Sequence, residues 1–94
     1  MIGRQVFYEG RVQGVGFRAT VRHISKGFEV VGWVKNLSDG RVELQVSGDA
    51  DEVRAFLDEI REGELHSYIK TVHECEIPPL AGAKGFEIAF EPGW

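Results

Sequence analysis

The 94-residue sequence has little of what several functional classes require. Its single cysteine, Cys75, excludes an internal disulfide and a multi-thiolate metal site and is typical of a reducing compartment. Basic residues are not in excess: the net charge is −4, which argues against nucleic acid as the main partner. No apolar run approaches membrane-spanning length, and the N-terminus lacks the apolar core of a signal peptide. We therefore expect a cytoplasmic protein with no membrane partner.

The composition is otherwise that of an ordinary globular chain. Hydrophobic residues make up 43% and charged residues 28%, which predicts one domain spanning residues 1–94 with a single modest core. The three histidines, His23, His66 and His73, have no ligand-like spacing, so we expect no metal and no cofactor.

Hydrophobic periodicity predicts the order of strands and helices. Alternating patterns predict strands over residues 4–12, 29–36, 41–47, 66–77 and 86–90, and Asp39-Gly40 is a hairpin signal between the second and third. Helical patterns run from Phe17 for about ten residues, with Gly27 as a stop, and from Asp49 to Gly63. This order predicts an α+β, ferredoxin-like (βαββαβ) sandwich. Its sheet is antiparallel, with two helices on one face and a short extra C-terminal strand.

Several local expectations accompany this fold. The polar residues of the third strand should lie on a solvated face, and Asp49 and Glu52 should cap the second helix reciprocally. A bulge is expected in residues 66–77, where Val72 breaks the alternation. Cys75 has no basic neighbours that would stabilise a thiolate, so we expect a small buried side chain rather than a nucleophile.

The stretch GRVQGVGFR, residues 10–18, carries the clearest functional signal. It follows a strand pattern, contains three glycines in seven residues, and ends where a helical pattern begins. Glycines let successive backbone N–H groups converge, and a helix N-terminus adds partial positive charge, so the stretch predicts an oxyanion site. Its spacing matches neither the dinucleotide fingerprint nor the Walker motif.

Two side chains are candidates for chemistry at this loop. A cation such as Arg18 in the first turn of a helix opposes the helix dipole, so its presence there favours an anion ligand over a solvent-facing role. Asn36 ends the second strand, where asparagine is often a turn-former. The expected topology also brings that strand end near the loop, where an amide could hold a water molecule.

The same residues resemble the acylphosphatase family. Residues 10–18 resemble its first signature, and residues 32–36, GWVKN, followed by Asp39, Gly40, Val42, Glu43 and Gly48, resemble its second. Residues 84–88, KGFEI, are similar to the usual ending of the family, and the interval of 18 residues between Arg18 and Asn36 is also the family's. The resemblance covers nearly the whole chain.

The resemblance implies hydrolysis of the carboxyl–phosphate bond of small-molecule acyl phosphates, with inorganic phosphate as a product. Arg18 would bind the phosphoryl group, and Asn36 would orient the attacking water. The backbone N–H groups that would share the phosphate with Arg18 belong to Gln13, Gly14, Val15, Gly16, Phe17 and Arg18 itself. No metal, cofactor or covalent intermediate is implied, and we expect a monomer.

Two departures and two alternatives accompany this interpretation. Relatives usually have glycine where this chain has Glu29, so either the first helix stops earlier or Glu29 adopts a strained turn. The tail at residues 91–94 extends beyond the usual end. One alternative is a non-catalytic anion-binding module of the same fold. The other is an RNA-binding sheet, which the acidic charge and the lack of aromatic residues in the third strand disfavour.

Overall fold

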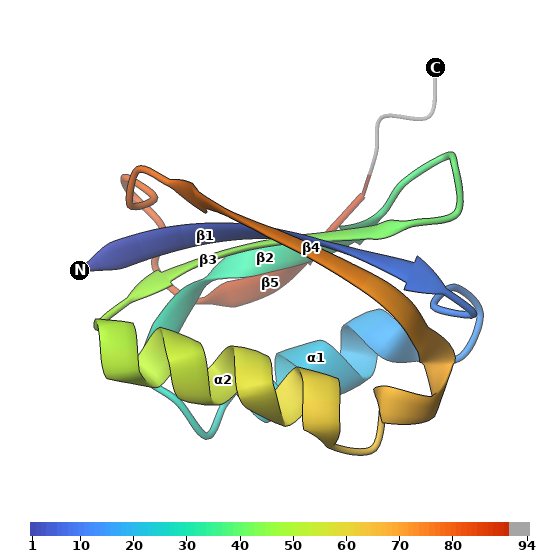
Figure 1. The fold of residues 1–94 in the computed structure, drawn as a ribbon. Coiled ribbons are helices and arrows are strands. Elements are labelled where there is room, and N and C mark those ends of the chain that lie inside the picture. The colour runs from blue at the N-terminus through green and yellow to red at the C-terminus, as the bar shows by residue number, and fades with distance from the viewer. Residues whose placement is uncertain (91–94) are drawn as a thin grey trace.

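The computed structural model describes residues 1–90, so the tail at residues 91–94 lies outside the described residues. Five strands form one sheet, and two helices cover one of its faces (Figure 1). The elements in chain order are β1 (Ile2–Gly10), α1 (Phe17–Ser25), β2 (Val30–Asn36), β3 (Val42–Gly48), α2 (Ala50–Glu62), the 3-10 turn η1 (His66–Tyr68), β4 (Ile69–Ile77) and β5 (Phe86–Ala89). This arrangement confirms the ferredoxin-like fold. Within residues 1–90, no helix is long and apolar enough to cross a membrane.

The strand order, β4-β1-β3-β2-β5, decides which strand ends meet. Both β1 and β2 pair antiparallel to β3, so they run in the same direction and end at the same edge of the sheet. The strand β5 pairs parallel to β2. The sheet is therefore mixed, and the expected antiparallel arrangement holds for β1 to β4 only.

The core lies between the sheet and the helices and anchors both ends of the glycine-rich loop. Val12, before the glycines, and Phe17, after them, are only 1% and 2% exposed. The Phe17 ring packs 5.2 Å from the ring of Tyr8 on β1, measured between centroids. Each such side chain stabilises the fold by about 1.5–3 kcal/mol through burial, so the loop between them is held at two fixed points.

The exit from β1 is fixed by Gly10. This residue has a φ of 134°, and a Cβ placed on it would lie 2.4 Å from the Tyr68 carbonyl oxygen. The Arg11 N–H then donates to that same oxygen at 2.9 Å. These constraints end the strand at Gly10 rather than at residue 12 as expected. The register shift between Glu9 and Gly10 leaves Lys70 as the extra residue of β4, so a bulge is present, but at Lys70 rather than at Val72, which pairs with Tyr8.

The first helix ends at Ser25 with Lys26 as its C-cap, so Gly27 is the first residue beyond the helix, as expected for its stop. Three turn hydrogen bonds follow Ser25, one of them from the Gly27 N–H to the Ile24 carbonyl oxygen at 3.0 Å. Glu29 has no positive φ. Because the helix ends before this position, Glu29 needs no strained turn and can stand where relatives usually have glycine. Its N–H donates instead to Glu52 Oε1 at 2.7 Å. The expected reciprocal cap is therefore wrong: Glu52 reaches across to the end of α1, and Asp49 makes no side-chain capping bond.

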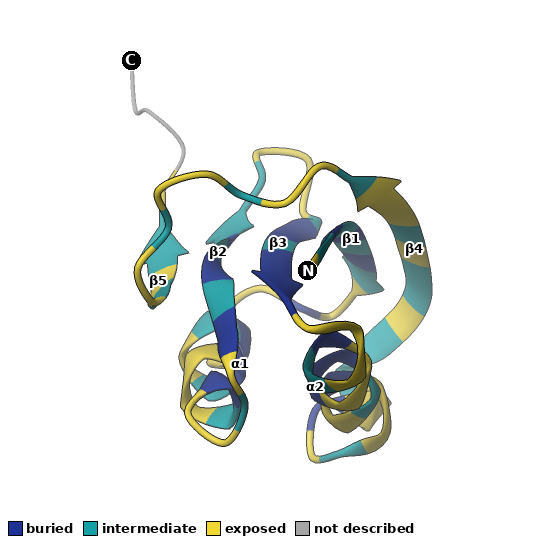
Figure 2. Ribbon diagram, turned by 90° about the vertical axis from the view of Figure 1, so that its left-hand side faces the viewer, coloured by how far each residue is buried: buried dark blue, intermediate teal, exposed yellow. Residues whose placement is uncertain are grey.

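Two expectations about exposure are also wrong, each because of the sheet topology. Residues 78–85 cross the face of the sheet opposite the helices (Figure 2). Ser47 on β3 is completely buried there, and its hydroxyl accepts a hydrogen bond from the Leu80 N–H at 2.8 Å. The supposedly solvated face of β3 is thus largely covered. Cys75 lies on the edge strand β4 and is exposed rather than buried.

Tyr8 provides a test of this packing at high pH. Burial raises the pKa of its hydroxyl far above the ordinary value of about 10. In the unfolded chain the hydroxyl ionises near pH 10, so above that pH the folded state binds more protons and the free energy of unfolding falls. We expect Tyr8→Phe to reduce this fall by about 1.4 kcal/mol per pH unit. Urea unfolding of both proteins at pH 9 and pH 11 measures it, and equal falls would contradict the burial of Tyr8.

Candidate active site

The candidate site lies where β1 and β2 end. The chain leaves β1 through residues 11–16 and enters α1 at Phe17, while Asn36 closes β2 at the same edge. The Gln13 side chain ties this loop to the hairpin after β2. Its Nε2 donates to the carbonyl oxygens of Leu37 and Arg41, at 2.8 and 3.0 Å. The sheet order therefore brings the loop and Asn36 together, as the topology predicted.

The hairpin that receives Gln13 is itself held by a local charge pair. The Asp39 carboxylate accepts hydrogen bonds from the Arg41 backbone N–H at 3.0 Å and from its guanidinium at 2.8 Å. These bonds hold the pKa of Asp39 below its ordinary range. Arg41 in turn presents the carbonyl oxygen that Gln13 binds, so the turn supports the position of the loop.

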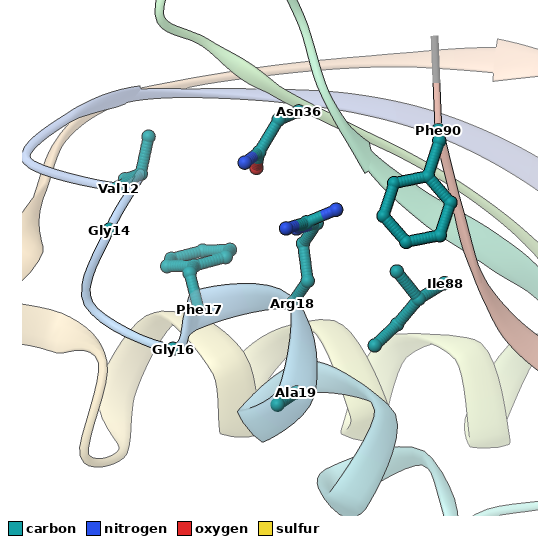
Figure 3. A pocket seen from close by; sticks show the side chains of 9 residues that line it. All are labelled: Val12, Gly14, Gly16, Phe17, Arg18, Ala19, Asn36, Ile88 and Phe90. Carbon is teal, nitrogen blue, oxygen red and sulfur yellow. The ribbon is translucent and has the colours of Figure 1, made fainter.

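A pocket of about 220 Å³ opens between the loop, the start of α1 and the end of β2. Its walls come from the loop, from α1, from β2 and from the C-terminal strand (Figure 3). The lining residues are Val12, Gly14, Gly16, Phe17, Arg18, Ala19, Asn36, Ile88 and Phe90. Neither a carboxylate nor a histidine is among them.

The backbone of the loop is arranged for an anion. Gly14 and Gly16 have φ angles of 79° and 76°, which turn successive N–H groups in a way that other residues adopt at a cost. The backbone N–H groups of residues 13–19 make no hydrogen bond to any group of residues 1–90. Seven consecutive donors next to a pocket and a helix N-terminus favour a negatively charged ligand.

Arg18 places a positive charge in the same pocket. It is the second residue of α1, half-buried, and makes no salt bridge within residues 1–90. The two helices differ at their N-termini: α2 carries Asp51 and Glu52 in its first turn, whereas α1 carries no acidic side chain there. The positive end of α1 is thus reinforced by a cation rather than balanced by an anion, which favours a bound anion.

Asn36 directs its amide toward Arg18 across the pocket (Figure 3). Its Oδ1 is buried and has no hydrogen-bond partner within residues 1–90. The hydrogen bonds of the following turn are made by Leu37, Asp39 and Gly40, not by the Asn36 side chain. A buried polar atom without a partner costs about 1–3 kcal/mol, so a water molecule or ligand is the natural partner of this oxygen.

Some of the predicted loop residues line the pocket, and others hold the loop in place. Gly14, Gly16, Phe17 and Arg18 line the pocket, together with Asn36. Gln13 and Val15 do not line it: the side chain of Gln13 holds the hairpin, and that of Val15 packs against the core. No group of three or more histidine, cysteine or acidic side chains within residues 1–90 is placed to hold a metal ion.

Sequence reasoning missed the wall formed by Ile88 and Phe90. The guanidinium carbon of Arg18 lies 5.1 Å from the centroid of the Phe90 ring. The only available signal was the apolar alternation of the last strand. It could not be connected to the loop before the parallel pairing of β5 with β2 was known.

Gly14 and Gly82 allow a matched test of the loop. Their φ angles are 79° and 77°, and a Cβ on either would meet no atom within 4 Å, but Gly82 lies outside the pocket. Alanine at either position therefore costs about 1–2 kcal/mol of backbone strain without a clash. We expect Gly14→Ala to weaken the binding of inorganic phosphate at least tenfold, on the order of the loss that misplaced donors cause, whereas Gly82→Ala leaves it unchanged. Calorimetric titration with phosphate measures both, and equal affinities would argue against the loop as the anion site.

The chain is similar in sequence and in fold to known proteins. The sequence pattern of the acylphosphatase family matches residues 4–88. The chain is 42% identical over 84 residues to an acylphosphatase of Rubrobacter xylanophilus, covering 89% of this chain and 76% of that relative. The crystal structure of acylphosphatase from Bacillus subtilis superposes with a TM-score of 0.86 at 34% identity, covering 95% of this chain and 99% of the other. Full-length HypF, in its phosphate- and nucleotide-bound form, contains a segment that is 33% identical with a TM-score of 0.84. That match covers 98% of this chain but 12% of HypF.

Proposed function

The chain belongs to the acylphosphatase family, and we propose that it hydrolyses acyl phosphates by direct attack of a water molecule on phosphorus. The P–O bond to the acyl group breaks, its electron pair leaves with the carboxylate, and the water oxygen becomes the fourth oxygen of inorganic phosphate. One observation carries the proposal: the unpartnered Asn36 Oδ1 and the Arg18 guanidinium share one pocket beside unsatisfied backbone N–H groups.

In this proposal the phosphoryl group is bound by the loop and by Arg18. The backbone N–H groups of residues 13–18 and the guanidinium donate to the three non-bridging oxygens, whose charge is spread in the transition state. These donors are held by the core through Val12 and Phe17, so they need little reorganisation during the reaction. Loss of one such donor typically costs about 100- to 1000-fold in turnover.

Asn36 then orients the attacking water. Its Oδ1 accepts a hydrogen bond from the water and fixes the direction of the water oxygen's lone pair, which points at the phosphorus held by Arg18. An amide neither accepts nor donates a proton permanently, so this role is positioning in the transition state rather than general base catalysis.

We propose the carboxyl–phosphate bond as the one that is cleaved because the pocket-lining side chains within residues 1–90 include no carboxylate or histidine that could transfer a proton. A carboxylate is a good leaving group and needs little protonation, whereas the alkoxide or phenoxide of a phosphomonoester is a poorer leaving group and requires an acid. A site built only from N–H donors, a guanidinium and an amide is therefore suited to acyl phosphates. All of these groups come from one chain, so we propose that the protein acts as a monomer, and its lone thiol is consistent with action in the cytoplasm.

Phosphate release from benzoyl phosphate and from phenyl phosphate, compared side by side, tests this function. We expect rapid hydrolysis of the first, competitively inhibited by inorganic phosphate, and none of the second. Turnover of phenyl phosphate would require an acid that the proposed site lacks. Binding of phosphate without turnover of either compound would instead favour a non-catalytic anion-binding module, an alternative made relevant by the likeness to a small part of HypF.

A further inference from the structure

The pocket has two chemically different halves. The loop around Gly14 and Gly16 offers N–H donors, and Arg18 stands between this loop and an apolar wall formed by Ile88 and Phe90 (Figure 3). Ile88 is half-buried on β5 and packs against the core, so its position is fixed. Phe90 follows the strand and is 74% exposed, one of two large hydrophobic side chains that are exposed within residues 1–90, the other being Met1.

This wall has no function in binding the phosphoryl group itself. Neither side chain offers a hydrogen-bond donor, and an exposed aromatic ring gains little from the fold, since most of its surface stays in water. An apolar group that entered the pocket beside Phe90 would cover that surface. The wall is therefore suited to the part of the substrate that is not phosphate.

The shape of an acyl phosphate leads its acyl group to this wall. The group is attached to phosphorus through one bridging oxygen, so a phosphoryl group held by the loop must carry it toward a side of the pocket that is not occupied by the loop or by Asn36. Ile88 and Phe90 bound such a side, and Arg18 lies against the Phe90 ring. The acyl group would meet one methyl-bearing and one aromatic surface next to the bond that breaks.

We propose that Ile88 and Phe90 form an acyl-group subsite that favours acyl phosphates with an aromatic or bulky apolar acyl group over those with a small one. This inference rests on the proposed function and adds the substrate class. Phe90 determines specificity by contact with the acyl group, whereas Arg18 and the loop treat all acyl phosphates alike because they bind only the phosphoryl end.

The test compares benzoyl phosphate with acetyl phosphate in Phe90→Ala. We expect kcat/KM for benzoyl phosphate to fall about tenfold, mainly through KM, and that for acetyl phosphate to change by less than about twofold. The inhibition constant of inorganic phosphate should not change, because phosphate has no acyl group. Phe90→Leu, which keeps an apolar surface, should retain most of the preference. The exposure of Phe90 makes unfolding of these variants unexpected, and circular dichroism checks it.

A matched control is Phe7→Ala. The Phe7 ring also stacks with an arginine, Arg41, at 4.6 Å from the guanidinium carbon to the ring centroid, but it lies outside the pocket. In this variant the ratio of kcat/KM for benzoyl phosphate to kcat/KM for acetyl phosphate should stay unchanged.

Three results would overturn the inference. Equal losses on both substrates in Phe90→Ala, with weaker inhibition by phosphate, would mean that Phe90 only positions Arg18. No loss on either substrate would mean that the ring does not contact the acyl group. If the unmodified protein hydrolysed neither acyl phosphate, the proposed function would fail and the subsite with it, a result distinct from the other two.

Discussion

Arg18→Ala is expected to lower kcat/KM for benzoyl phosphate by about 100- to 1000-fold, since it removes the only side-chain cation that lines the pocket within residues 1–90. Arg18→Lys should restore little of this activity, because an ammonium cannot present the planar fork that matches two phosphoryl oxygens. The binding of inorganic phosphate should weaken in both variants. Steady-state kinetics and phosphate inhibition measure these effects.

The same substitution should leave the fold intact. Removal of a cation from the first turn of α1 relieves its opposition to the helix dipole, so the free energy of unfolding should be unchanged or rise by about 0.3–1 kcal/mol. Arg22→Ala is the matched control: it removes an arginine one turn later on the same helix and outside the pocket. Activity in Arg18→Ala similar to that of Arg22→Ala would refute the assignment of phosphoryl binding to Arg18.

Asn36→Ala is expected to lower kcat by about 100- to 1000-fold while phosphate inhibition stays nearly unchanged. The reason is that the amide contacts the attacking water rather than the phosphoryl oxygens. Asn36→Asp, whose side chain has nearly the same shape as asparagine, should be no more active than Asn36→Ala. A carboxylate facing Arg18 would repel the phosphoryl group and compete with it for the guanidinium.

The free energy of unfolding of Asn36→Ala distinguishes a water-orienting role of Asn36 from a role as a turn-former. The Asn36 Oδ1 is buried without a partner in residues 1–90, so its removal should change the free energy of unfolding by less than about 1 kcal/mol. A clear loss of stability with nearly normal kcat would identify Asn36 as a turn residue and leave the attacking water without a protein group to orient it.

The extent to which this site is predictable from sequence depends on how local each feature is. Gly14, Gly16 and Arg18 lie within five residues of each other, and backbone conformation and helix-dipole arguments apply to them directly. Asn36 required one further step, the knowledge that β1 and β2 flank β3 and end at one edge. That step follows from the predicted order of elements, so the pair could be anticipated.

Features that depend on distant contacts were not predictable in this way. Glu52 was expected to cap its own helix, but the Glu29 N–H competes for its carboxylate across the fold. Ser47 alternates like a solvated residue, yet the crossing segment through Leu80 buries it. Ile88 and Phe90 reach the pocket only because β5 pairs with β2 at the far edge of the sheet.

The final position of the oxygen atom from the attacking water distinguishes attack on phosphorus from attack on the carbonyl carbon. Benzoyl phosphate is hydrolysed by the protein in ¹⁸O-labelled water, and the products are analysed by mass spectrometry after subtraction of the uncatalysed reaction. Attack on phosphorus by the water that Asn36 orients predicts one labelled oxygen in the inorganic phosphate and none in benzoate. Label in benzoate would show attack at the carbonyl carbon, in which case the water oriented by Asn36 does not attack phosphorus.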